Sequence, residues 1–97
     1  MTHFILLLLE NHMQVKEAVQ KASKYLPEVF ETAADRELRL EGVEKSDDGR
    51  FWKVTFSYDT SNPTSLMRIL RDYKTVKLRD DNGEFMGAQD GKLLGEL

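Results

Sequence analysis

The sequence contains no cysteine among its 97 residues. This absence excludes disulfides, thiolate nucleophiles, iron–sulfur clusters and cysteine-based zinc sites together. Histidine is also scarce, since His3 and His12 are the only two, and their spacing does not match metal ligands on one helix face. We therefore expect no metal site and no cofactor. A chain without cysteine suits a reducing compartment, so we expect a cytoplasmic protein.

The sequence also lacks a long apolar run and an excess of positive charge. The run Phe4–Leu9 is far shorter than the roughly 20 apolar residues that a membrane-spanning helix needs. A net charge of −3 does not provide the excess of positive charge that is typical of a nucleic-acid-binding protein. One local basic group has acidic neighbours and no interleaved aromatic residues on which bases could stack. It comprises Arg68, Arg71, Lys74, Lys77 and Arg79. We expect neither a membrane span nor nucleic-acid binding.

Sequence motifs for catalysis are missing as well. The chain has no glycine-rich phosphate loop and no nucleophile elbow. The acidic segments Asp47–Gly49 and Asp80–Gly83 resemble calcium loops, but such a loop closes on a glutamate at its twelfth position, where this chain has Tyr58 and Gly91. Turn-forming residues are the better interpretation of both segments. We therefore expect no catalytic residues and no enzyme activity.

The segment that begins near Met13 predicts an amphipathic helix of about four turns. Lysine, glutamate and glutamine occupy its polar face and are good helix formers. Pro27 removes a backbone donor, so we expect a kink there, or a helix end followed by a short second turn. The apolar face consists of Val15, Ala18, Val19, Ala22, Leu26, Val29 and Phe30.

Two hairpins are expected after the helix. Apolar and polar residues alternate in Leu38–Val43, and this alternation breaks at Gly42, where a β-bulge would restore the register. A turn at Ser46–Gly49 leads into Phe51–Tyr58, which alternates strictly. The helix-facing side of this strand consists of Trp52, Val54, Phe56 and Tyr58. The second hairpin joins the strands Tyr73–Arg79 and Glu84–Ala88 through the turn Asp80–Gly83, after a short helical turn that begins at Thr64 or Ser65 and includes Leu66–Leu70.

These elements predict an α+β fold in which one amphipathic helix packs on a curved four-stranded antiparallel sheet. Residues 13–88 form the single domain, 1–12 an apolar N-terminal extension, and 89–97 a loose C-terminal tail. The order of the helix and hairpins, and the sequence segments that form them, resemble those of small uncharacterised bacterial proteins with a cystatin-like or PepSY-like fold. These segments are Val15–Ala22, Gly49–Phe56, Tyr73–Leu78 and Asp80–Phe85. The resemblance implies a binding or inhibitory module, although the protease-binding motif Q-x-V-x-G of cystatins is missing.

We therefore expect a non-enzymatic binding module that binds a protein or itself, inhibitor-like or immunity-like at most. The alternative is a small-ligand-binding or enzymatic cone-shaped α+β domain with a pocket lined by Trp52, Phe56 and Tyr58. The apolar run is the candidate interface of a homodimer, or else a buried strand, or an extension before a natural start at Met13. It comprises Phe4, Ile5, Leu6, Leu7, Leu8 and Leu9.

Overall fold

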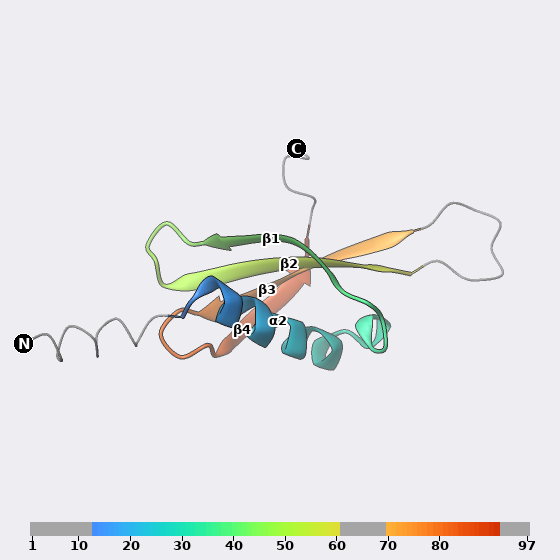
Figure 1. Ribbon diagram of the computed structural model, residues 1–97, viewed down its shortest axis with the longest axis horizontal. Helices are drawn as coiled ribbons and strands as arrows, with labels where there is room; N and C mark the ends of the chain where they lie inside the picture. Colours follow the sequence, from blue (N-terminus) through green and yellow to red (C-terminus); the bar gives the residue numbers. More distant parts are fainter. Residues whose placement is uncertain (1–12, 61–69, 92–97) are drawn as a thin grey trace, which may run out of the picture.

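The computed structural model describes residues 13–60 and 70–91 (Figure 1). Within these residues, one α-helix, one short 3-10 helix and four strands follow one another. They are α2 (Val15–Val29), η1 (Glu31–Ala33), β1 (Arg39–Lys45), β2 (Phe51–Asp59), β3 (Arg71–Arg79) and β4 (Phe85–Asp90). The strands form one antiparallel sheet in the order β1-β2-β3-β4. The predicted α+β fold, with one helix on a four-stranded antiparallel sheet, is confirmed.

Local chemistry explains the turns and irregularities of the sheet. The β1–β2 register shifts between Leu40 and Gly42, which confirms the predicted bulge. The turn before β2 places Gly49 at a φ of 73°, and the turn after β3 places Gly83 at 72°, a conformation that glycine adopts without strain. A Cβ on Gly83 would also lie 2.6 Å from Lys21 Cδ, so this turn packs directly against α2. A second register shift lies between Lys77 and Leu78.

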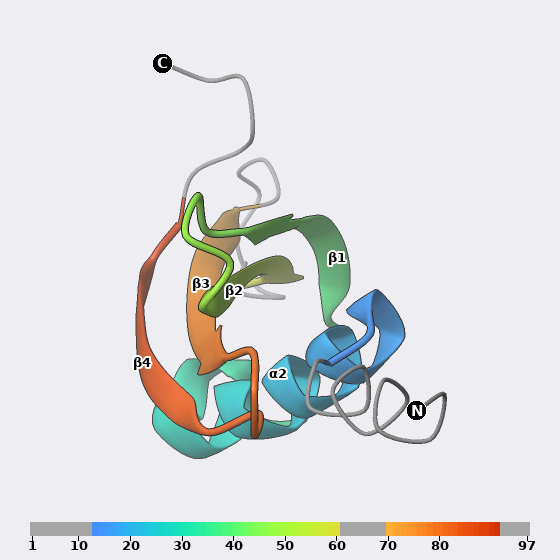
Figure 2. The same cartoon turned by 90° about the vertical axis from the view of Figure 1, so that its left-hand side faces the viewer.

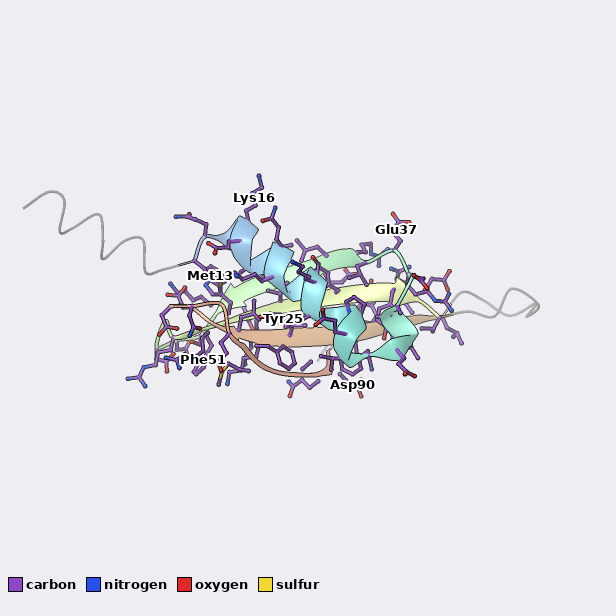
Figure 3. All side chains as sticks on the ribbon, turned by 90° about the horizontal axis from the view of Figure 1, so that it is seen from below. Met13, Lys16, Tyr25, Glu37, Phe51 and Asp90 are labelled. Carbon is purple, nitrogen blue, oxygen red and sulfur yellow. The ribbon has the colours of Figure 1, made fainter. Side chains whose placement is uncertain are left out.

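Helix α2 lies across one face of the sheet, over β2, β3 and β4 (Figures 2 and 3). Ala18, Ala22 and Leu26 are its buried residues, and the two small alanines let the helix backbone approach the strands. Together with these, the buried apolar core consists of Met13, Ala33, Trp52, Val54, Phe56, Tyr58, Val76 and Leu78. The predicted helix-facing side of β2 is therefore confirmed.

One detail of the helix prediction is wrong. Val15 and Val29 were expected on the buried face, yet they are 54% and 46% exposed. They are the first and last residues of α2, and periodicity assigns a face without showing how far the sheet extends beneath it. Pro27 lies within the helix, which ends only at Val29. The short turn that was one of the two expected alternatives follows as η1.

Two polar anchors hold the helical segment on the sheet. At the start, Met13 N donates to the carbonyl of Asp80 at 3.1 Å, and the Asp80 carboxylate accepts from Trp52 Nε1 at 2.6 Å. At the end, the hydroxyls of Thr32 and Tyr58 are 2.9 Å apart and share a hydrogen bond. Because these anchors lie at opposite ends of α2, they fix its direction across the strands.

Several sequence predictions fall wholly or partly outside the described residues. The N-terminal extension 1–12, the helical turn up to residue 69 and the end of the tail after Gly91 belong to this group. Strand boundaries differ slightly from expectation: β3 begins at Arg71 and β4 runs from Phe85 to Asp90. Periodicity identifies strands better than it identifies their first and last residues.

Candidate functional site

The face of the sheet that points away from α2 is the candidate site, and we call it the open face. Successive side chains of a strand point to opposite faces, so the positions that alternate with the core residues lie here. On the central strands it consists of the cross-strand pairs Phe51–Arg79, Lys53–Lys77, Thr55–Thr75, Ser57–Tyr73 and Asp59–Arg71. Within residues 13–60 and 70–91, no helix covers this face (Figure 2).

One end of the open face carries a hydrogen-bonded group of four side chains, which we call the Ser57 cluster. Its members are Arg39, Glu41, Ser57 and Arg71. Ser57 Oγ donates to Glu41 Oε2 at 2.5 Å, and Arg39 Nε donates to the same oxygen at 2.7 Å. Arg71 Nε and Nη2 donate to Ser57 Oγ at 3.1 and 3.0 Å. The cluster links β1, β2 and β3, so it braces the sheet from its open side.

The chemistry of the Ser57 cluster is structural. The hydrogen bonds from Ser57 and Arg39 stabilise the carboxylate and hold the pKa of Glu41 below its ordinary value. A carboxylate beside a serine hydroxyl resembles a nucleophile with its base. However, Ser57 is 0% exposed, and its oxygen is already engaged by Glu41 and Arg71, so a substrate cannot reach it.

The other end of the open face carries two lysines directly opposite each other. Lys53 on β2 pairs in register with Lys77 on β3. The Lys77 ammonium lies 4.2 Å from the centroid of the Phe51 ring. Among the described residues, neither lysine has an acidic group within 4.0 Å. Like charges directly opposite one another destabilise a sheet, so the Lys53–Lys77 contact does not itself stabilise the fold, although Glu44 on β1 lies opposite Lys53 on its other side.

A depression of about 270 Å³ lies beside the lysine pair. It exists because β4 places Gly87 opposite Lys77 and so contributes no side chain there. The φ of Gly87 is 146°, which favours glycine, and a Cβ at this position would meet no atom within 4 Å. The residues that line it are Lys53, Thr75, Lys77, Met86, Gly87, Ala88 and Gln89. The depression is thus cationic, and Met86 is its exposed apolar side chain.

Two further depressions differ in their charge. One of about 460 Å³ lies at the hairpin end, where Arg79 is paired with Asp81 at 2.9 Å. It is lined by Gly49, Arg50, Phe51, Arg79, Asp80, Asp81 and Met86. One of about 360 Å³ lies next to the Ser57 cluster and is lined by Arg36, Glu37, Leu38, Arg39, Asp59 and Arg71. Both contain acidic as well as basic side chains, unlike the depression beside the lysine pair.

The three residues of the predicted ligand pocket lie under α2. Trp52, Phe56 and Tyr58 are all buried, and none lines the three depressions described above. The polar atoms of Trp52 and Tyr58 are engaged by Asp80 and Thr32. These aromatic side chains belong to the hydrophobic core, and the structure places them on the face opposite the lysine pair.

The remaining sequence predictions concern the apolar run and the basic group. The predicted interface Phe4–Leu9 and both histidines lie outside the described residues. The basic group divides between two faces: Lys77 and Arg79 lie on the open face, whereas Lys74 lies on the helix face, 4.6 Å from the Phe30 ring centroid and paired with Asp90. It therefore does not form one continuous basic surface.

Sequence reasoning missed the lysine pair. The alternation of β2 placed Lys53 on the outer face, but the partner of each residue depends on the β2–β3 register. Short turns fix register in hairpins, and β2 and β3 are joined by a longer connection. It also missed that Thr55 and Ser57 are buried on the open face. No local signal in the sequence indicates that Glu41 and Arg71 engage Ser57, or that Thr75 contacts Thr55.

Other site types find little support in the described part of the chain. No group of three or more His, Asp or Glu side chains in it could hold a metal ion. Its one α-helix is too short and too polar to cross a membrane. Both edge strands carry register shifts relative to their neighbours, which disfavours strand addition at the edges. Comparisons with protein-family models, with curated proteins and with solved structures find no match for this chain.

Proposed function

We propose that this protein is a non-enzymatic binding module that engages a protein partner through the open face. The observation that carries the proposal is the lysine pair: Lys53 and Lys77 face each other, and among the described residues neither has an acidic group within 4.0 Å. A repulsive pair on an accessible face is useful when a partner supplies the opposite charge. Phe51, Tyr73 and Met86 add the aromatic and methionine side chains that are enriched in interfaces.

The form of this face favours a protein over a small molecule. Small-molecule sites are concave and lined mainly by hydrophobic and aromatic side chains. The depression beside the lysine pair is lined instead mainly by charged and polar groups, with Met86 as its exposed apolar side chain. The resemblance to cystatin-like and PepSY-like proteins is compatible with this role, because the resemblance implies binding or inhibitory modules, but fold alone does not assign function.

Photo-crosslinking tests the proposal in cells that express the protein naturally. A photoreactive phenylalanine analogue replaces Gln89 on the open face or, in the control, Lys16 on the outer side of α2 (Figure 3). We expect a discrete covalent adduct to another protein from position 89 and none from position 16. An adduct with twice the mass of the chain would identify a second copy as the partner. No discrete adduct from position 89, or equal adducts from both positions, would refute the proposal.

A further inference from the structure

The geometry of the lysine pair points to the chemistry of the partner: we propose that the open face binds an acidic peptide segment, in which two neighbouring carboxylates meet Lys53 and Lys77. This inference rests on the proposed function and specifies the partner. Residues directly opposite each other in an antiparallel pair have Cβ atoms about 4.5–5.5 Å apart. The two lysine side chains therefore start from adjacent positions, which places two positive charges on one part of the open face in a chain of net charge −3.

The surroundings of the two lysines favour an anion over a neutral partner. Lys77 is held over the Phe51 ring, so its position is partly fixed before binding. Lys53 is exposed, and its other cross-strand neighbour, Glu44, makes no ion pair with it within 4.0 Å. Binding two carboxylates would relieve the repulsion between the lysines. The two lysines are therefore more stable with an anion bound than without it, and this difference favours an anionic partner over a neutral one.

The dimensions of the face fit an extended peptide. Side chains at alternating positions of an extended strand point to the same side and are about 6.6–6.8 Å apart. The flexible lysine side chains can span the difference between this spacing of the peptide carboxylates and the shorter distance between the Cβ atoms of Lys53 and Lys77. The bare backbone at Gly87 lets a peptide approach closely, and Met86 offers an apolar contact for the residue between the two carboxylates.

A nucleic acid is the less suitable polyanion. Single-stranded nucleic acids are held by aromatic platforms along a continuous basic groove. Here Phe51 is already covered by Lys77, and the nearby Arg79 is neutralised by Asp81 and Glu84. The positive charge is confined to one small area, so two carboxylates match it better than a long phosphate backbone does.

The test is an NMR titration of the full-length protein with the peptide acetyl-Ser-Glu-Leu-Glu-Ser-amide. The matched neutral peptide has glutamine at both glutamate positions, and a short oligothymidylate serves as the nucleic-acid probe. We expect the acidic peptide to shift the amide signals of Lys53, Lys77 and Gly87 more than those of α2. Raising the salt concentration should weaken binding, because exposed ion pairs are screened.

Two variants of equal charge make the test specific. The double variant Lys53→Glu with Lys77→Glu should bind the acidic peptide at least about tenfold more weakly, a change of roughly 1.4 kcal/mol. The control Lys16→Glu with Lys24→Glu changes the net charge by the same amount on exposed positions of α2 and should bind within about twofold of the natural protein. Unchanged amide spectra away from the substitutions establish that each variant is folded.

The remaining outcomes overturn the inference in distinguishable ways. Absence of shifts at high peptide concentration, equal binding of the neutral peptide, or equal loss in both variants would exclude the acidic-peptide site. Tighter binding of the oligothymidylate would identify nucleic acid, and not an acidic peptide, as the ligand of this face. If crosslinks from position 89 persist in the variant with both open-face lysines reversed, the proposed function stands and the acidic-peptide inference fails. If no crosslink forms from position 89, the proposed function itself fails.

Discussion

Polar groups on the two faces of the sheet differ in whether they are paired within the protein. Under α2, the buried Asp80 carboxylate is engaged by Trp52 and by Lys45, whose Nζ is 3.4 Å away. Among the described residues, every buried side-chain nitrogen and oxygen has a hydrogen-bond partner. On the open face, Lys53 and Lys77 lie opposite each other, and in the described part of the chain neither forms an ion pair with a carboxylate. A buried polar group must be paired because water cannot solvate it, whereas an exposed one can be left for another molecule.

The largest difference between the faces should appear in their phenylalanines. Phe56 is 3% exposed in the core under α2, whereas Phe51 is half-buried on the open face. Phe56→Ala should lower the free energy of unfolding by about 3–5 kcal/mol, because it removes buried contacts and leaves a cavity. Phe51→Ala should cost clearly less. Urea denaturation of both variants measures the difference. Equal costs would show that the open face contributes as much to the core as the helix face.

Removing the buried carboxylate should have the next largest effect. Asp80→Ala leaves the Trp52 N–H without its acceptor and removes the partner of Lys45. An unsatisfied buried donor costs about 1–3 kcal/mol, so stability should fall by that amount. The control is Asp81→Ala, which removes an exposed ion pair with Arg79 and should cost at most about 1 kcal/mol. Thermal and urea unfolding of the two variants check the order, and a larger loss in the control would contradict it.

The Ser57 cluster should make stability depend on pH. The pKa of Glu41 is lowered in the folded protein, chiefly because Ser57 and Arg39 donate hydrogen bonds to its carboxylate. A group whose folded pKa is depressed contributes stability that is present above its unfolded pKa and is lost as the pH falls through the folded pKa. Acidification from neutral pH into that range should therefore destabilise the natural protein.

The control for this prediction replaces Glu41 with glutamine. Glu41→Gln keeps the size of the side chain but removes the titrating group, so the pH dependence below the unfolded pKa of glutamate should become shallower. Glu84→Gln is the matched surface variant, because Glu84 lies 3.9 Å from Arg79 and is exposed. Urea midpoints measured across the acidic range compare the three proteins. Parallel curves for the natural protein and Glu41→Gln would show that the cluster does not couple folding to protonation.

The sequence predicts the helix face far better than the open face. Alternation in Phe51–Tyr58 and the helical period around Ala18 and Ala22 identify two apolar surfaces, and burial forces these surfaces together. Glycine marks the bulge at Gly42 for an equally local reason. The lysine pair and the Ser57 cluster depend on which residues of separate strands become neighbours. That information comes from register and side-chain reach, and neither has a local pattern in the sequence.

The smallest predicted effect is the repulsion within the lysine pair. Each lysine also makes other interactions, since Lys77 lies over Phe51 and Lys53 is opposite Glu44. Single substitutions therefore mix several small contributions, and we expect Lys53→Gln and Lys77→Gln each to change stability by less than about 1 kcal/mol. A double-mutant cycle isolates the interaction between them, because contributions of each lysine to other residues cancel.

The cycle should give a coupling free energy of about 0.2–1 kcal/mol with the sign of repulsion. Either single substitution already removes the repulsion, so the double variant should be less stable than the sum of the two single effects predicts. The coupling should shrink at high salt, since the Debye length falls to about 3 Å at 1 M. Urea unfolding at low and high salt provides both values. An attractive coupling, or one that salt does not change, would mean that the two ammonium groups do not interact through their charges. The positive charge would then not be concentrated where the acidic peptide is proposed to bind.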